Sequence, residues 1–228
     1  MTVDGEPATI GQKVDPATAA VMIDGIRLPV RPDAVYYLLY KPVGVISTIS
    51  DEQGRRTVTD LVPHSPPVYP VGRLDADSEG LIILTNDGDL THHLTHPRFG
   101  VTKTYMALVS GRLKPRQAKL LEAGVILEDG PAAATAARIV DVGSKGTLLE
   151  VVMTEGRNRE VRRMVAALGN EVLQLVRTAI GDLQDRALQP GSWRHLGLPE
   201  VRRLYAIGAG NESETAWDNA ADVESDTE

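Results

Sequence analysis

The stretch Pro70-Val-Gly-Arg-Leu-Asp-Ala-Asp-Ser-Glu-Gly-Leu-Ile-Ile-Leu-Thr-Asn-Asp-Gly-Asp89 organises the rest of the chain. It begins as a glycine-hinged loop that carries Arg73 and Asp75, and it ends in the apolar run Leu81–Leu84. A short β-branched run that is closed by Asn-Asp-Gly is typical of a buried strand followed by a tight turn. The stretch therefore predicts a charged loop held directly against a buried strand.

The loop places Arg73, Asp75 and Asp77 within five residues. An aspartate beside an arginine can stay ionised in a partly desolvated pocket, which is what a carboxylate nucleophile requires. An ordinary ion pair on a surface loop explains the same residues, and this stretch alone does not separate the two interpretations.

Composition restricts the class of protein. The chain has 228 residues, enough to bury a core, and it contains no cysteine, which excludes disulfides and thiolate metal sites. No apolar run approaches the length of a membrane span, and the amino terminus lacks a signal-peptide pattern. We expect a cytoplasmic protein with no membrane partner.

The formal net charge of −7 is concentrated at the carboxyl end. Residues 211–228 hold seven acidic residues and no lysine or arginine, so the remainder of the chain is formally neutral. An acidic, small and polar segment predicts a disordered tail over residues 206–228. The overall acidity is therefore no argument against a nucleic-acid partner.

Two further patterns bear on a metal site. Asp75-Ala-Asp77 is similar to the metal-binding pair of some transferases, and His92, His93 and His96 lie on or beside one short predicted helix. Asp-x-Asp is common by chance, Arg73 disfavours a cation, and no further ligand is implied by the spacing. We expect no metal.

The segment Glu155–Gly169 predicts a helix from Asn158 to a stop at Gly169. Its apolar stripe comprises Val161, Met164, Val165 and Leu168. Arg162 falls at the edge of that stripe, whereas the other arginines of the segment, Arg157, Arg159 and Arg163, form an outward basic cluster. A solvated basic face and an RNA-binding face both remain open.

The other predicted elements are short. Residues 2–30 form a small β-unit, in which Val-Asp-Gly and Ile-Asp-Gly are hairpin-type turns. Further strands are expected at Tyr36–Pro42, Gly44–Ser50, Val101–Val109 and Glu171–Arg177, a hairpin at 133–153, and helices at Leu90–Leu94, capped by Asp89, and Lys114–Ala123. Lys103 and Tyr105 share one face of their strand.

Seven of these stretches together resemble the RsuA/RluB-type ribosomal RNA pseudouridine synthases. They occur in the order of that family across roughly residues 35–197, at Tyr40–Gly44, Val71–Gly88, Leu94–Pro97, Lys103–Tyr105, Glu155–Met164, Arg177–Gly181 and Leu188–Arg194. Several are long, so the resemblance is specific.

The resemblance implies an α+β fold with a central mixed, largely antiparallel sheet. It implies a catalytic domain over residues 34–205, preceded at 1–33 by a partial alpha-L RNA-binding module of the type found in a small-subunit ribosomal protein. The helical first half of that module is expected to be missing, because Met1 falls in its middle. The alternative for residues 1–33 is a hairpin that has no role in binding RNA.

The resemblance also implies isomerisation of a uridine in ribosomal RNA to pseudouridine, without cofactor or metal. The residues Asn158-Arg-Glu-Val-Arg162 favour large-subunit over small-subunit RNA. The expected partner is ribosomal RNA or a pre-ribosomal particle, and we expect a monomer.

By family motif, Asp75 is the nucleophile, Tyr105 lies against the target base, Arg162 pairs with the aspartate and Arg73 supports the flipped nucleotide. The residues expected to contact RNA are Arg157, Arg159, Arg163, Lys103 and Lys41. Attack at the sugar, attack on the base and a route through a glycal remain open.

Two alternatives belong to other classes of protein. A non-catalytic RNA-binding ribosome-assembly factor could keep the same fold, although binding alone needs no carboxylate in the cleft. A metal-dependent transferase would use Asp75 and Asp77.

Overall fold

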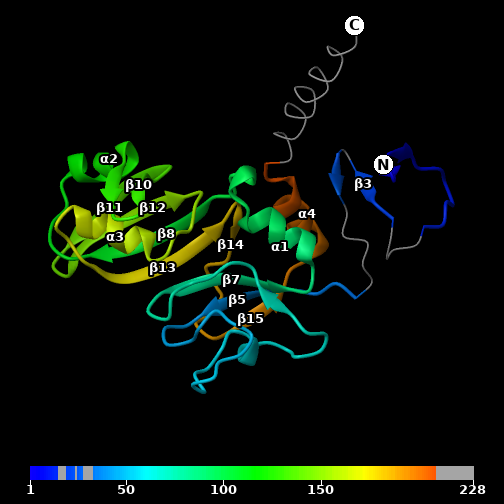
Figure 1. Ribbon diagram of the computed structural model, residues 1–228, viewed down its shortest axis with the longest axis horizontal. Coiled ribbons are helices and arrows are strands. Elements are labelled where there is room, and N and C mark those ends of the chain that lie inside the picture. The colour runs from blue at the N-terminus through cyan, green and yellow to red at the C-terminus, as the bar shows by residue number, and fades with distance from the viewer. Residues whose placement is uncertain (15–18, 24, 28–32, 209–228) are drawn as a thin grey trace, which may run out of the picture.

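One long sheet runs through the body of the molecule (Figure 1). The computed structural model describes residues 1–14, 19–23, 25–27 and 33–208. The nine strands of the sheet are β5 (Tyr36–Lys41), β6 (Tyr69–Pro70), β7 (Glu79–Thr85), β8 (Lys103–Val109), β11 (Ala136–Gly143), β12 (Gly146–Met153), β13 (Val172–Ile180), β14 (Leu183–Gln184) and β15 (Trp193–His195).

The main strands lie in the order β11-β12-β8-β13-β7-β5-β15, with β14 beside β13 and β6 beside β7. Every pairing in this sheet is antiparallel except that of β13 with β7, which is parallel. The predicted mixed, largely antiparallel sheet and the α+β class are confirmed.

The helices cover the sheet in two groups (Figure 1). They are α1 (Gly88–Thr95), α2 (Pro115–Ala123), α3 (Glu160–Ala167) and α4 (Leu198–Ala206), with 3-10 turns η1 (Thr59–Leu61) and η2 (Pro97–Phe99). Buried side chains of α2 and α3 pack with those of β8, β12 and β13, whereas α1 and α4 pack with β5 and β7. A small hairpin of β9 (Val125–Leu127) and β10 (Gly130–Ala132) joins the first group.

Strands β5 and β7 are buried on both faces, as their nearly unbroken apolar sequences predict. Leu38 and Ile83 face the cluster that contains α1 and α4, whereas Leu39 and Ile82 face a second cluster beneath residues 45–74. The loop that precedes β7 is thus held from both sides of the sheet.

The parallel pairing of β7 with β13 depends on Gly80. Gly80 is paired with Arg177, it has a φ of +111°, and a Cβ at this position would collide with the backbone of Arg177. Only glycine combines this backbone conformation with so close an approach of two strands.

The amino-terminal residues form a separate four-stranded sheet of order β2-β1-β3-β4, as the turn pattern predicts. Its strands are β1 (Thr2–Val3), β2 (Glu6–Pro7), β3 (Val21–Ile23) and β4 (Ile26–Arg27). The predicted domain boundary at residues 33 and 34 adjoins residues 28–32, which lie outside the described residues. Whether this unit is half of an alpha-L module stays a prediction.

Three local predictions are wrong. Residues 44–50 form a loop with a single bridge between Ile46 and Thr57, since the chain turns away from the sheet there. Asp87, rather than Asp89, caps α1 by accepting from the backbone N–H groups of Asp89 and Leu90. The helix α3 begins at Glu160, and Arg159 before it has a φ of +49°.

The carboxyl end of the body extends slightly beyond the predicted boundary at 205. Helix α4, which the sequence analysis does not identify, ends at Ala206, and the carbonyl of Ile207 lies 2.7 Å from Nε2 of His93. Residues 209–228 of the predicted acidic tail lie outside the described residues.

Replacement of Gly80 by alanine should separate β7 from β13. We expect Gly80→Ala to lower the free energy of unfolding by at least about 2 kcal/mol, because a strained φ and a backbone collision coincide. Gly88→Ala is the matched control, because Gly88 begins α1 and a Cβ there meets nothing within 4 Å. It should stabilise the protein or change its stability by less than about 1 kcal/mol. Urea unfolding measures the stability of both variants. Equal stabilities would contradict the dependence of the parallel β7–β13 pairing on Gly80.

Candidate active site

The loop between β6 and β7 carries Arg73 and Asp75. Its conformation is fixed by hydrogen bonds to residues 44–47, which lie about thirty positions earlier in the chain. Ser47 Oγ accepts from the backbone N–H of Leu74 at 3.0 Å and donates to its carbonyl at 2.9 Å. The N–H of Gly44 donates to the carbonyl of Ala76 at 2.7 Å, and the side chain of Leu74 is buried. Residues 44–47 therefore hold the chain on either side of Asp75.

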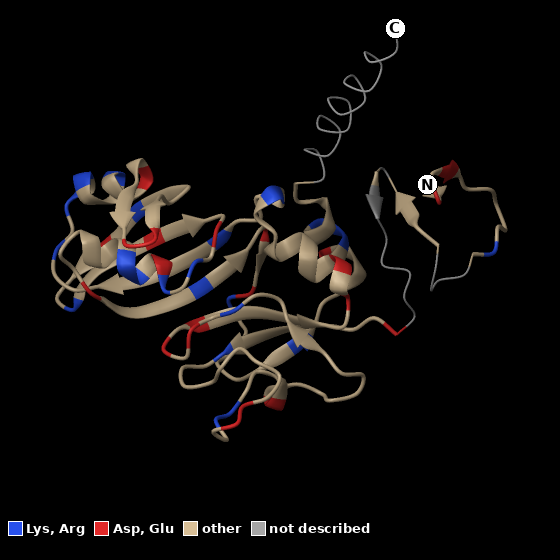
Figure 2. Cartoon of the chain, in the orientation of Figure 1, with Lys and Arg blue, Asp and Glu red and all other residues tan. Residues whose placement is uncertain are grey.

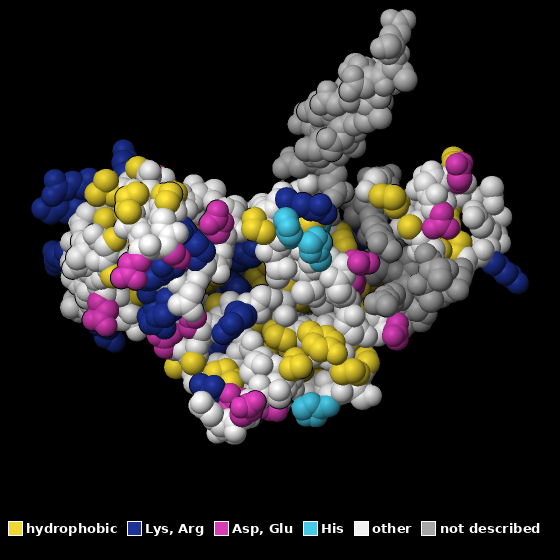
Figure 3. All heavy atoms as spheres, viewed as in Figure 1, with side chains coloured by type: hydrophobic (Ala, Val, Ile, Leu, Met, Phe, Trp, Pro, Cys, Tyr) yellow, Lys and Arg dark blue, Asp and Glu magenta, His cyan; other side chains and the backbone are white. Residues whose placement is uncertain are grey.

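Two adjoining cavities open beside this loop. The larger has a volume of about 560 Å³ and the smaller about 190 Å³. Both are lined by Arg73, Tyr105, Glu155, Gly156 and Arg157. Figure 3 shows Lys and Arg atoms deep in the hollow between the half that carries α2 and α3 and the part that carries α1.

Asp75 lines the smaller cavity and is half-buried. Its carboxylate has no hydrogen bond or ion pair with the described part of the chain. Its negative charge opposes the lowering of the Lys41 pKa that burial causes, and it adds to the raising of the Arg159 pKa, which is due mainly to the hydrogen bond with Asp77. Asp75 is thus an uncommitted carboxylate among cations.

Asp77, two residues later, forms ion pairs with Arg159 and Arg162. Nη1 and Nη2 of Arg159 lie 2.9 Å from Oδ1 and Oδ2 of Asp77, and Nε of Arg162 lies 3.5 Å from Oδ2. The hydrogen bond from Arg159 lowers the pKa of Asp77. The expected pairing of Arg162 with Asp75 is therefore not what the structure shows, because the loop turns at Ala76 and presents Asp77 to α3 instead.

Arg162 nonetheless reaches inward, as its position at the edge of the apolar stripe predicts. Its guanidinium donates to the carbonyl of Val172 at 2.9 Å and to that of Asp77 at 2.8 Å. Its side chain is only 12% exposed. Arg162 therefore ties α3 and β13 to the end of the Asp75 loop.

Tyr105 and Arg73 are brought to Asp75, as predicted. Tyr105 lies on β8 between Val151 of β12 and Arg177 of β13, and it lines both cavities. Arg73 also lines both cavities, is exposed, and makes no ion pair with the described residues. The sequence motif and the fold thus agree on these two neighbours of Asp75.

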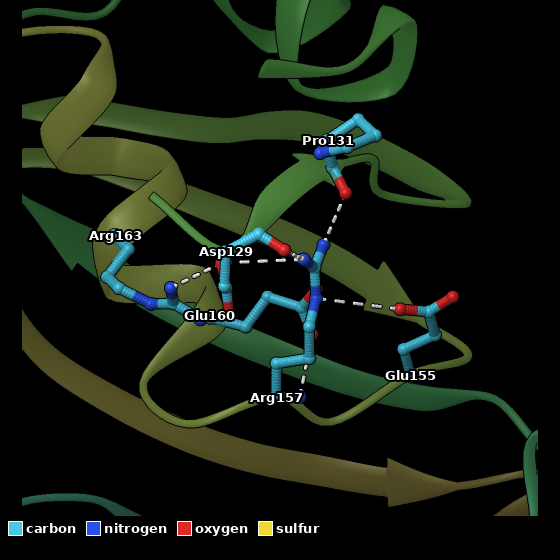
Figure 4. A network of polar contacts seen from close by, with 6 residues as sticks. All are labelled: Asp129, Pro131, Glu155, Arg157, Glu160 and Arg163. Atoms are coloured by element: carbon cyan, nitrogen blue, oxygen red, sulfur yellow. Dashed lines mark hydrogen bonds and ion pairs between the residues drawn. The ribbon is translucent and has the colours of Figure 1, made fainter. Parts of the chain in front are cut away.

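Arg157 lies at the centre of a network of charges on the cavity wall (Figure 4). Its guanidinium lies 2.8 Å from Glu160 and 3.7 Å from Glu155, and it donates to the carbonyl of Pro131 at 2.6 Å. Asp129 joins this network and also binds Arg163 at 2.7 Å.

The predicted outward basic cluster is therefore held by acidic residues. Arg157, Arg159 and Arg163 each have a carboxylate partner, and Figure 2 shows acidic and basic residues intermixed around α3. Contact with RNA would require these arginines to exchange or share their partners. Their role in RNA binding stays a prediction.

Lys41 does not fit the predicted role. It is completely buried, and its ammonium donates to the carbonyls of Ser78 at 2.8 Å and Pro42 at 3.0 Å. With no exposed surface it cannot contact RNA in this conformation, and it supports the end of the Asp75 loop instead. Lys103 does line the larger cavity, with its ammonium on the carbonyls of Val101 and Leu94.

Two charged residues of the cavity wall are not among the residues predicted from sequence. Arg177 lies in the middle of β13, is 4% exposed and lines the larger cavity. Glu155 lines both cavities. A charged residue inside an otherwise apolar strand is the signal that identifies Arg177 from sequence.

Within the described residues no group of three or more His, Cys, Asp or Glu side chains could hold a metal ion. The rings of His92 and His96 pack against each other at a tilt, as do those of His93 and Phe99. In the same part of the chain no helix is long and apolar enough to cross a membrane.

The buried lysines predict a dependence of stability on pH. Burial lowers the pKa of Lys103, and that of Lys41, from 10.5 to about 8. Between these values the unfolded chain binds more protons than the folded protein, so stability rises with pH. We expect the urea midpoint of the wild type to increase from about pH 7.5 to about pH 9.5, and Lys103→Met to remove about half of that increase, since Lys41 remains. If the urea midpoint rises as much in Lys103→Met as in the wild type, the lowered pKa of Lys103 is contradicted.

Comparison with known proteins agrees with this geometry. Residues 35–167 match the family described as RNA pseudouridylate synthase. An RNA pseudouridine synthase of Mycobacterium tuberculosis is 45% identical over 212 residues, which cover 90% of this chain and 84% of that protein. Ribosomal large subunit pseudouridine synthase B of Bacillus subtilis is 40% identical over 209 residues, covering 90% and 85%.

A solved structure supports the same family. A crystal structure of a pseudouridylate synthase has a TM-score of 0.69 at 27% identity and covers 89% of this chain and 87% of its own. The predicted fold and the predicted enzyme class are confirmed by these matches. The chain belongs to the RNA pseudouridylate synthase family.

Proposed function

We propose that this enzyme isomerises a specific uridine of large-subunit ribosomal RNA to pseudouridine, with Asp75 as the nucleophile. The choice of ribosomal RNA is supported by relatives named as ribosomal large subunit pseudouridine synthases, B of Bacillus subtilis and E of Xanthomonas campestris, the latter 45% identical over 175 residues. The Asn158–Arg162 sequence favours the same subunit.

The observation that carries the assignment of Asp75 is its lack of a partner. Three carboxylates line the smaller cavity, and two of them, Glu155 and Glu160, are paired with Arg157. Asp75 has no such partner within the described residues. A half-buried carboxylate without a bound cation is the group able to attack a substrate.

The chemistry needs no external reactant. The bond between N1 of uracil and C1′ of ribose breaks, the base turns within the pocket, and a bond forms between C5 and C1′. The proton lost from C5 balances the one gained at N1. Asp75 holds the sugar or the base while the base is detached, and the cations Arg159 and Lys41 lie near enough to interact electrostatically with its carboxylate.

The target nucleotide must leave its stack to reach Asp75, because the reacting atoms are not accessible within a helix. Tyr105 lies on the shared wall of the two cavities and offers a ring against which the base stacks. Arg73, exposed at the rim, supports the displaced nucleotide.

A non-catalytic assembly factor with this fold is the alternative. Such a factor would also bind RNA, but an uncommitted Asp75 beside Tyr105 would then have no use. We further propose that the enzyme acts as a monomer on ribosomal RNA or a pre-ribosomal particle. Sedimentation of the enzyme alone and with the RNA tests this.

Asp75→Asn should abolish isomerisation and leave the fold intact. The variant removes the nucleophile but changes little volume, so we expect turnover to fall at least about 10³-fold and stability to change by less than about 1 kcal/mol. Release of tritium from [5-³H]uridine-labelled ribosomal RNA measures turnover. Asp141→Asn, at an exposed position of β11, is the control and should retain wild-type activity. Turnover by the Asp75 variant at the wild-type rate would refute the assignment.

Replacements of Tyr105 separate the ring from the hydroxyl. Stacking contributes about 1–3 kcal/mol per base, so Tyr105→Leu should lower single-turnover rates roughly 5- to 150-fold. Tyr105→Phe keeps the ring and should lose much less. If loss of the hydroxyl alone is as damaging as loss of the ring, Tyr105 acts instead in proton transfer.

A further inference from the structure

The wall of the larger cavity carries two cations, one buried and one half-buried, that the reaction at Asp75 does not use. Arg177 of β13 and Lys103 of β8 both line it. They approach closely enough for the positive charge of Arg177 to contribute to lowering the pKa of Lys103. Two like charges held together away from water are costly, so their arrangement needs an explanation.

Arg177 has few of its possible hydrogen bonds. Its Nε donates to the carbonyl of Leu81 at 2.7 Å, whereas Nη2 is buried and has no partner. The described residues place no carboxylate in an ion pair with it. A guanidinium that is 4% exposed and lacks a counter-ion is an incomplete site.

Lys103 is similarly incomplete. Its ammonium donates to the carbonyls of Val101 at 2.7 Å and Leu94 at 3.1 Å, which leaves a further donor. No acidic side chain pairs with it among the described residues. The two carbonyls fix the ammonium at the wall of the cavity.

The remaining charges of the cavity wall do not neutralise this pair. Arg73 adds a further positive charge at the rim. Glu155 is the acidic residue of the wall, and it is largely exposed and lies 3.7 Å from Arg157. Arg157 in turn is bound by Glu160. The cavity is therefore positively charged at Arg177 and Lys103, beside walls made by apolar residues such as Leu94, Pro97 and Ile180.

We propose that Lys103 and Arg177 bind a backbone phosphate of the substrate strand, next to the nucleotide that is displaced toward Asp75. A phosphate supplies the missing negative charge and accepts from both side chains, and arginine and lysine are the usual partners of phosphate. The two cavities share Tyr105 and Arg73, so a nucleotide with its base in the smaller cavity extends its backbone into the larger one.

The inference rests on the proposed function for the identity of the strand, but not for the presence of an anion site. A phosphate held in the larger cavity would keep the displaced nucleotide in register with Asp75, whatever the sequence around it. Lys103 and Arg177 are then positioning residues for the substrate rather than groups that react.

Binding of mononucleotides tests the site without any turnover. Calorimetric titration at pH 7 and about 0.1 M salt compares uridine, uridine 5′-monophosphate, uridine 3′-monophosphate and inorganic phosphate. One of the two monophosphates should bind roughly tenfold or more tightly than uridine, as one charge-assisted contact provides. Inorganic phosphate, which lacks the base, should bind more weakly than that nucleotide.

Lys103→Met then locates the effect. The variant should bind the preferred monophosphate roughly tenfold more weakly while its affinity for uridine is unchanged. Lys145→Met removes the same charge at the β11–β12 turn, and it should bind all four ligands as the wild type does. Lys145 lies at the opposite end of the β8–β12 ladder, because Met153 pairs with Lys103 and Thr147 with Val109.

Equal affinities of the wild-type protein for uridine and both monophosphates would overturn the proposal, and this result does not depend on the folding of any variant. Inorganic phosphate that binds as tightly as the nucleotide would overturn the assignment to a substrate strand. A wild-type protein that discriminates the monophosphate but forms no pseudouridine would refute the proposed function and leave the phosphate site standing.

Discussion

The backbone contact between Gly80 of β7 and Arg177 of β13 is the constraint on which the site depends. It is the one parallel seam in the nine-stranded sheet, and it joins the half that carries α2 and α3 to the half that carries α1 and α4. Arg177 also pairs with Tyr105, and Gly80 with Lys41, so these residues lie in one row across the sheet. The Asp75 loop, which leads into β7, is thereby set opposite Tyr105.

Charge pairing on either side of this seam separates the residues that support the loop from Asp75, the proposed nucleophile. Arg159 and Arg162 fix the loop through Asp77, and Lys41 fixes it through the carbonyl of Ser78. Because these cations are committed to the loop, Asp75 is surrounded by positive charge without being bound by it. Asp75 thus lines a cavity whose wall also carries the ring of Tyr105 and the cation Arg73.

Much of the fold follows from local patterns. The apolar run before Asn86 predicts β7, and the stripe of Val161 and Met164 predicts α3, because both patterns depend only on neighbouring residues. The parallel seam could not be derived in this way, since it joins residues almost a hundred positions apart. The sequence also could not decide which aspartate the arginines bind, because the turn at Ala76 is fixed by Gly44 and Ser47. Sequence alone does not distinguish Lys41 from a surface lysine, because its burial and its hydrogen bonds to the carbonyls of Pro42 and Ser78 depend on the fold.

The measurement that tests the central claim most directly is a map of pseudouridine at single-nucleotide resolution across both ribosomal RNAs. Cells that lack this protein are compared with their parent and with cells complemented by the wild-type gene. The account predicts that a site in the large-subunit RNA is lost and then restored, while the small-subunit map is unchanged. Identical maps in all three strains would contradict it.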